Sequence, residues 1–117
     1  TDDPIILGRN IKDSAIALNL IQEEARNVVV EGQVQNVEIR ELRSGRNLLT
    51  FEIADATDGI SGKLFFDDKE QSNKVSAAFT NGLTVKVKGT VQFDKFSNEL
   101  VIYPDSISRI FKDSRKE

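Results

Sequence analysis

The chain contains no cysteine, no histidine, no methionine and no tryptophan, and it has only two prolines among its 117 residues. Without cysteine, neither a disulfide framework nor a thiolate metal site can form, and the composition suits a reducing compartment. Histidine and cysteine are the side chains that most often transfer protons or attack substrates near neutral pH. We therefore expect a cytoplasmic protein that is not an enzyme.

Long apolar runs are absent as well. No run approaches the roughly 20 apolar residues that a membrane span needs, and no signal-peptide pattern opens the chain, so we expect no membrane partner. The length suits one compact domain and is too short for two ordinary ones. Because methionine is missing even at position 1, we expect this domain to be a piece of a longer polypeptide.

The chain carries no strong charge of either sign. Its 16 Lys and Arg residues against 19 Asp and Glu residues leave a formal net charge of -3. Proteins that hold nucleic acid mainly by charge are usually strongly basic. Any basic surface on this domain must therefore be local.

Residues 27–66 hold the strongest pattern, which predicts three β-strands, the first two joined by a basic loop at residues 41–47. The apolar residues of the first strand change parity along its length: Val28, Val30 and Val34 against Val37 and Ile39. Because side chains alternate faces with period two, the change indicates an inserted residue, a β-bulge near Gln35 and Asn36. We expect this strand to bend.

The next two strands each have one apolar face. In the second strand the apolar face consists of Leu49, Phe51 and Ile53, and in the third of Ile60, Gly62, Leu64 and Phe66. The opposite face of the third strand carries Ser61, Lys63 and Phe65. The pattern therefore predicts that Lys63 and Phe65 point away from the core.

A fourth strand has the longest alternation in the chain: Leu83, Val85, Val87, Gly89, Val91 and Phe93. A loop at residues 94–99 predicts a hairpin into a fifth strand over residues 100–103. Pro104 indicates an edge or the end of that strand, because proline cannot donate a ladder hydrogen bond. Ile107, Ile110 and Phe111 are expected to continue the apolar contact.

Two helices are predicted. Ser14 is a typical N-cap, and Ile16, Leu20 and Ile21 follow at helical spacing, so we expect a short amphipathic helix that ends near Glu24 and covers one end of the barrel. Asp67 and Asp68 can cap a second helix that includes Val75, Ala78 and Phe79, with Asn81 and Gly82 closing it. The second helix lies between the third and fourth strands.

This order of elements predicts a mainly β fold, a five-stranded OB-fold Greek-key barrel with a helix between strands three and four and a short N-terminal helix. Residues 1–26 are expected to form a leading segment with the capping helix, residues 27–111 the barrel, and residues 112–117 a charged tail to a following domain. Such barrels bind chains across strands two and three and the loops joining strands one to two and four to five.

Pairs of carboxylates are the remaining candidates for metal chemistry. Asp55 and Asp58 flank a turn, and Asp67 and Asp68 precede a helix, so each pair could hold a hard cation. Aspartate is also favoured at both positions for local hydrogen bonding, and we prefer that interpretation. No glycine-rich phosphate loop occurs, and we expect neither a metal nor a cofactor.

The candidate binding residues combine cations with aromatic rings: Arg40, Arg43, Arg46, Lys63, Phe65, Lys95 and Phe96. Cations that follow the phosphates and rings that stack on the bases are what a single-stranded nucleic-acid site requires.

Each candidate also has an ordinary interpretation. Phe65 could pack against a neighbouring domain, Phe96 could fold back over the barrel end, and the arginine loop could be a solvated tip neutralised by Glu38 and Glu41. Lys86 and Lys88 fit a wet strand face better than a binding site.

These residues resemble a known family. The runs VVVEG (28–32), EIRELRSGR (38–46), LLTF (48–51), DATD (55–58), VKVKGTVQFDKFS (85–97) and PIILGR (4–9) are similar to the OB domain of PolC, the Gram-positive type of DNA polymerase III α chain. The likeness covers nearly the whole chain. One departure is that the helix after Phe66 is poor in lysine, so it offers little for phosphate.

The resemblance implies an accessory single-stranded DNA-binding module of a bacterial replicative polymerase, in contact with the template strand. Its expected partners are single-stranded DNA, other domains of the same polymerase chain and replisome proteins. Polymerase catalysis would lie in parts of the polymerase outside this domain. Two alternatives stay open: a protein-docking module within the polymerase or replisome, and an RNA-binding OB domain.

Overall fold

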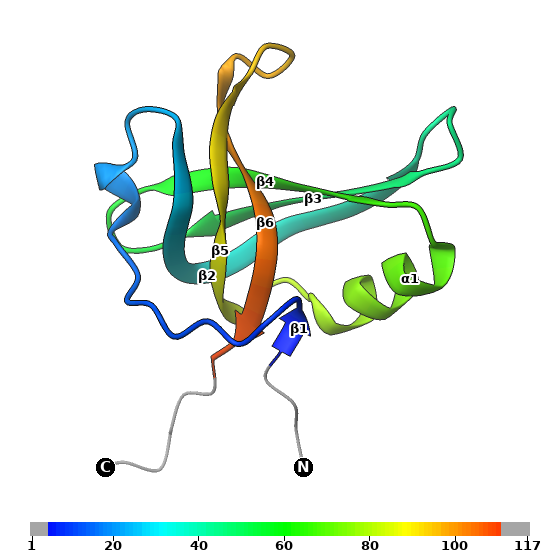
Figure 1. Ribbon diagram of the computed structural model, residues 1–117, viewed down its shortest axis with the longest axis horizontal. Coiled ribbons are helices and arrows are strands. Elements are labelled where there is room, and N and C mark those ends of the chain that lie inside the picture. Colours follow the sequence, from blue (N-terminus) through cyan, green and yellow to red (C-terminus); the bar gives the residue numbers. More distant parts are fainter. Residues whose placement is uncertain (1–4, 111–117) are drawn as a thin grey trace.

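Alternating apolar and polar residues form the strands of a small barrel with one helix below it (Figure 1). The computed structural model describes residues 5–110. In chain order the elements are β1 (Ile5–Leu7), the 3₁₀ turn η1 (Leu18–Leu20), β2 (Ala25–Glu41), β3 (Asn47–Ala54), β4 (Gly59–Phe66), α1 (Lys69–Ala78), β5 (Thr84–Asp94) and β6 (Glu99–Arg109).

The strands lie in the order β1-β6-β4-β3-β2-β5, and β5 also pairs with β6, which closes β2 to β6 into a ring. All pairs are antiparallel except β4 with β6, which are parallel. The predicted fold class, a five-stranded OB-type barrel with a helix between its third and fourth strands, is confirmed. The sequence pattern missed β1, which pairs with β6 outside the ring, because three residues are too few to show an alternation.

The predicted bend in the first barrel strand is confirmed. β2 runs for 17 residues, its register against β3 shifts between Gln35 and Glu38, and Asn36 has a φ of 54°. The extra residue lets the first half of β2 pair with β5 and the second half with β3. The β2–β3 hairpin therefore extends away from the barrel, as Figure 1 shows.

The core fills the barrel with side chains from every barrel strand. Phe51 and Phe79 meet edge to face with ring centres 4.8 Å apart, and both are buried. Gly62 lies under the Phe51 ring, where an added Cβ would be 2.2 Å from a ring carbon. Val75 of α1 joins Phe79 in closing the barrel from below.

The predicted amphipathic helix from Ser14 to Glu24 is wrong. Ile16 instead donates its backbone N–H to the Val29 carbonyl at 2.9 Å and forms an isolated bridge beside β2. Only a single 3₁₀ turn, η1, follows, and its N-cap is Ala17. The Ile16 N–H is taken by β2, and the Leu18 and Asn19 N–H groups donate to the side chains of Asp55 and Thr57, so tertiary contacts override the local helical pattern.

The second predicted helix is confirmed as α1, but its predicted end is wrong: the helix stops at Ala78 with Phe79 as its C-cap, and the Gly82 N–H donates to Val34 of β2 instead of closing the helix. Asp68 is its N-cap, and the Asp68 carboxylate accepts the Glu70 N–H at 3.0 Å. Such a side-chain cap satisfies one of the donors that the first helical turn leaves without a backbone partner. The cap therefore fixes where the chain leaves β4.

Two details of the last hairpin differ from the prediction. The fourth strand keeps its alternation up to Val91, but Phe93 is 47% exposed and Asp94 is buried, because the strand has passed the end of the barrel there. Pro104 lies inside β6 rather than at its end, at a register shift opposite Lys88 and Gly89. A bulge tolerates proline since no ladder donor is required.

The predicted domain boundaries stay predictions, and Phe111 and residues 112–117 lie outside the described residues. Within residues 5–110, no helix is long and apolar enough to cross a membrane.

Candidate nucleic-acid interface

The outer face of β2, β3 and β4 brings an arginine and a ring into one row. Arg40 of β2 is opposite Leu48 of β3, and Leu48 is opposite Phe65 of β4. Directly opposite residues of an antiparallel pair point to the same face. Arg40 and Phe65, 25 residues apart in sequence, therefore flank Leu48 on one surface.

Phe65 also has a cation above its ring. The guanidinium carbon of Arg46 lies 5.1 Å from the ring centre, and Arg46 Nε donates to Asp67 Oδ1 at 2.8 Å. Arg46 thus pairs with Asp67 rather than with the predicted neutralising residues, Glu38 and Glu41. With 42% of its surface exposed, Phe65 offers a flat apolar face next to a positive charge.

The next row along the same face consists of Glu38, Thr50 and Lys63. Beside it lies a groove of about 400 Å³ between β3, β4 and the β5–β6 hairpin. Its charged lining residues are Glu38, Glu52, Lys63 and Glu99, so carboxylates outnumber cations. The floor of the groove therefore repels phosphate.

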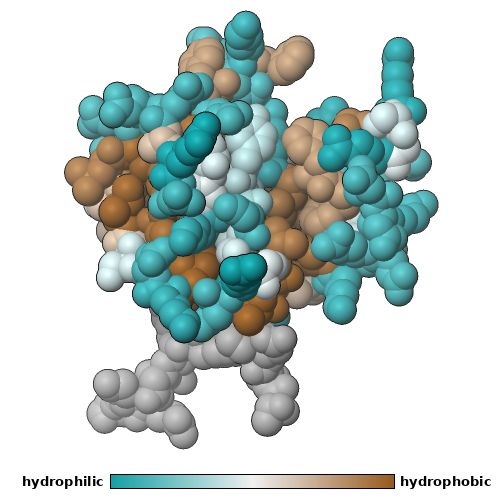
Figure 2. Space-filling view, viewed as in Figure 1, coloured by the Kyte–Doolittle hydropathy of each residue, from teal (hydrophilic) through white to brown (hydrophobic). Residues whose placement is uncertain are grey.

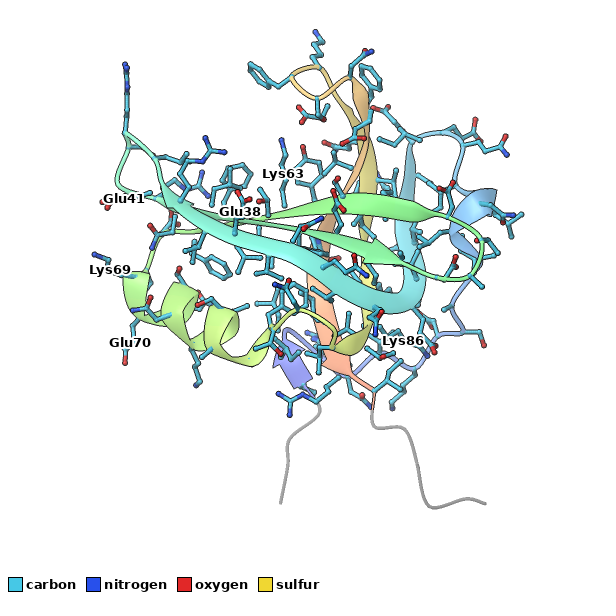
Figure 3. All side chains as sticks on the ribbon, turned by 180° about the vertical axis from the view of Figure 1, so that it is seen from behind. Glu38, Glu41, Lys63, Lys69, Glu70 and Lys86 are labelled. Carbon is cyan, nitrogen blue, oxygen red and sulfur yellow. The ribbon has the colours of Figure 1, made fainter. Side chains whose placement is uncertain are left out.

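Lys63 makes an ion pair across this groove. Its Nζ lies 2.5 Å from Oδ2 of Asp94, at the start of the hairpin loop, and Figure 3 shows the Lys63 side chain extending from β4 toward that hairpin. Asp94 also accepts from the Ser97 hydroxyl at 2.9 Å. The Lys63 ammonium first, and then the Ser97 hydroxyl, hold the pKa of the Asp94 carboxyl below its ordinary value. The charge of Lys63 is thus compensated within the domain.

The other three predicted residues, Arg43, Lys95 and Phe96, lie at the ends of the two hairpins and are exposed. Phe96 is 98% exposed, so the alternative in which it folds back over the barrel is wrong. Figure 2 shows mainly hydrophilic side chains at the end of the β2–β3 hairpin, whereas apolar side chains gather on the side that carries η1.

The lysines of β5 lie away from this face. Lys88 forms an ion pair with Asp13 at 2.7 Å, and Lys86 donates to the Asp13 carbonyl at 2.9 Å. Figure 3 shows Lys86 at the opposite end of the barrel from the hairpins. These lysines attach the leading segment to β5, and the expectation that they are not part of the binding site stays a prediction.

Asp55, Asp58 and Asp68 make turn and cap contacts, as in the preferred interpretation, whereas Asp67 pairs with Arg46. Asp55 accepts the N–H groups of Thr57 at 2.7 Å, Asp58 at 3.0 Å and Leu18 at 2.9 Å. The Thr57 hydroxyl first, and then the Leu18 N–H, hold the pKa of Asp55 far below its ordinary value. No group of three or more acidic side chains within residues 5–110 is arranged to hold a metal ion.

The sequence analysis missed two features of this face. It treated Asp94 as a turn residue, although Asp94 binds Lys63, and it did not foresee the carboxylates of the groove. Neither has a local signal, because Lys63 and Asp94 are 31 residues apart and meet only when the barrel closes.

A barrel of this topology with cations and rings on this face defines a class, the OB-fold domains that bind nucleic acid. The model of the OB-fold nucleic acid binding domain family matches residues 28–110, and the chain belongs to this family. The domain is therefore a nucleic-acid-binding module by family.

The more particular resemblance to PolC is also confirmed. The chain is 39% identical over 99% of its length to the PolC-type DNA polymerase III of Halalkalibacterium halodurans. It spans only about 8% of the length of the curated relatives it matches. The prediction that this domain is an OB-fold binding module related to the PolC-type polymerases is thereby confirmed.

Solved structures show the same fold at low identity. RecG bound to a three-way DNA junction superposes with a TM-score of 0.63 and 21% identity, covering 94% of this chain and 14% of RecG. The mitochondrial single-stranded DNA-binding protein Rim1 of S. cerevisiae gives a TM-score of 0.55 and 13% identity, covering 75% of this chain and 96% of Rim1. At these identities the likeness concerns the fold alone.

Proposed function

We infer that this domain is an accessory single-stranded DNA-binding module of a cytoplasmic bacterial replicative polymerase and that it contacts the template strand. The PolC-type relatives support the polymerase context. RecG is described in a complex with a DNA junction, and Rim1 is described as a single-stranded DNA-binding protein. Both descriptions are consistent with a DNA partner for this barrel. The following contacts support the assignment of the face.

The observation that carries the proposal is the exposed Phe65 ring with Arg46 5.1 Å from its centre. A base stacked on Phe65 would place its own phosphate close to the Arg46 guanidinium. Stacking of one base on an aromatic ring is worth about 1–3 kcal/mol and tolerates any base. A second exposed ring, Phe96, stands on the hairpin on the other side of the groove.

The charges on this face suggest the path that a bound single-stranded DNA would follow. Carboxylates of Glu38, Glu52 and Glu99 line the groove, so the phosphates would avoid its floor and follow the two hairpins. The cations on these hairpins are Arg40, Arg43, Arg46 and Lys95, and of these Arg46 also pairs with the exposed Asp67 carboxylate. If all four contact phosphate, the slope of log K against log salt should be about -3.

The experiment is a chemical-shift titration of the domain with single-stranded DNA of about 12 nucleotides, together with fluorescence anisotropy at several salt concentrations. We expect the largest shifts in β3, β4 and the two hairpins, and affinity that falls with salt. A matching RNA strand tests the RNA alternative: tighter binding of RNA than of DNA would indicate a contact to the 2′-hydroxyl, whereas a stacking surface without this contact binds both alike. Shifts confined to β5 around Lys86 and Lys88 would contradict the proposed face.

Protein docking remains the second candidate, because the acidic groove and the net charge of -3 do not attract a polyanion. Exposed Ile16 and Leu20 on the side of η1 offer an apolar surface to another polymerase domain or a replisome protein. A docking module would show no affinity for single strands at any salt concentration. The same titration therefore separates the two functions.

A further inference from the structure

The Lys63–Asp94 ion pair joins two elements of the proposed interface. Lys63 comes from β4, which carries Phe65, and Asp94 begins the loop that carries Phe96. Both side chains are shielded from solvent, with exposed fractions of 22% for Lys63 and 7% for Asp94. A shielded pair is screened less by salt than a surface pair, so it persists where surface contacts weaken.

Asp94 also organises the loop itself. Its carboxylate accepts from the Ser97 hydroxyl at 2.9 Å and from the Phe96 N–H at 3.3 Å, and its carbonyl accepts the Asn98 N–H at 2.8 Å. Asn98 has a φ of 59°, which reverses the chain into β6. Phe96 is thereby held on the outside of a loop whose inner side is occupied by one carboxylate.

We propose that Lys63 and Asp94 are positioning residues for nucleic-acid binding: their ion pair holds the β5–β6 hairpin against β4 so that Phe96 stands beside the groove. This inference rests on the proposed function. Lys63 and Ser97 both line the groove, so the ion pair sets its width between β4 and the hairpin loop. The ion pair thereby links the strand that carries Phe65 to the loop that carries Phe96.

The sign of one mutational effect separates this role from a charge contact. Asp94→Asn removes a negative charge, so electrostatics alone predicts tighter binding of a polyanion. Loss of positioning predicts weaker binding. Lys63→Gln should likewise weaken binding with an unchanged salt slope, whereas loss of a phosphate contact would reduce the slope by about 0.7.

The test is fluorescence anisotropy with a labelled single strand of about 12 nucleotides, measured between about 50 and 200 mM salt. For Asp94→Asn and Lys63→Gln we expect affinity to fall at least about fivefold, the lower end for one stacked base, with the wild-type slope. In a Phe96→Ala background, Asp94→Asn should have little further effect, because the two changes remove the same contact.

Asp13→Asn is the matched control, because it breaks the Lys88 ion pair away from the groove, and it should not weaken binding. If thermal melting shows that Asp94→Asn does not fold, Ser97→Ala decides: it removes only the hydroxyl contact to Asp94 and should weaken binding without changing the slope. If a folded Asp94→Asn binds the single strand as tightly as the wild type or more tightly, the inference is overturned while the proposed function stays in place. The same holds for Ser97→Ala in the case where Asp94→Asn does not fold. A wild-type domain that binds no single strand would overturn both.

Discussion

Replacing Phe65 by alanine tests the stacking surface directly. The change removes the ring that lies under Arg46, so a bound base loses its partner. At about 1–3 kcal/mol for one stacked base, the dissociation constant for single-stranded DNA should rise roughly fivefold to about 150-fold. Phe65→Trp should retain most of the affinity, because a second flat ring can stack.

The effect on stability should be much smaller than loss of a core phenylalanine. Full burial of a phenylalanine contributes about 1.5–3 kcal/mol, and Phe65 is 42% exposed, so roughly half of that is at stake. The Arg46 contact adds about 0.5–1 kcal/mol at an exposed site. We expect the free energy of unfolding to fall by about 1.3–2.5 kcal/mol and the Tm by roughly 5–10 °C.

Phe93→Ala is the matched control for this prediction. Phe93 is 47% exposed, and it follows the opposite strand parity from Asp94, so it points away from Lys63 and the groove. It should lose similar stability and no affinity, as measured by thermal melting and fluorescence anisotropy. Equal losses of affinity in Phe93→Ala and Phe65→Ala would refute the assignment of the binding face, and a loss of more than about 4 kcal/mol in Phe65→Ala would mean that its ring is buried.

Three further changes test the rest of the structure. Arg46→Glu should weaken DNA binding more than Lys86→Glu in the same salt series, because only Arg46 borders the proposed face; the reverse order would move the site to β5. Val87→Asp should prevent cooperative folding, observed by circular dichroism, because an unpaired carboxylate at this fully buried position costs several kcal/mol out of a total of about 5–15. The pKa of Asp55 is lowered by folding, so the contribution of its carboxylate to stability is present above about pH 4 and is lost as pH falls through the folded-state pKa. The difference in Tm between the wild type and Asp55→Asn should therefore become smaller as the pH is lowered. A difference that stays constant would contradict this.

Several local features could be predicted from the sequence because their cause lies within a few residues. The parity change between Val34 and Val37 identified the bulge, since only an inserted residue shifts the alternation. Asp68 was identified as a cap because a short carboxylate reaches the first N–H groups of its own helix. The outward direction of Phe65 follows from strand parity alone.

The N-terminal segment shows where local reasoning fails. Ile16, Leu20 and Ile21 have helical spacing, but the Ile16 N–H pairs with the Val29 carbonyl and the Leu18 N–H with Asp55. These partners lie 13 and 37 residues away in sequence, so no local pattern can reveal them. A short segment adopts whichever structure satisfies its backbone donors in the folded chain.

The sequence by itself determined the barrel class and the outward face of Phe65, because both depend on periodicity or nearest neighbours, whereas the exposure of Phe93 and Phe96 depends on where the barrel ends. Only the tertiary structure decided which charges remain available for a ligand. Closing β5 onto β6 brings Asp94 to Lys63, and the β2–β3 register brings Arg40 into one row with Phe65. Coulomb interactions act through space and fall off with distance, so the state of a charged side chain depends on residues that are remote along the chain and adjacent in the fold.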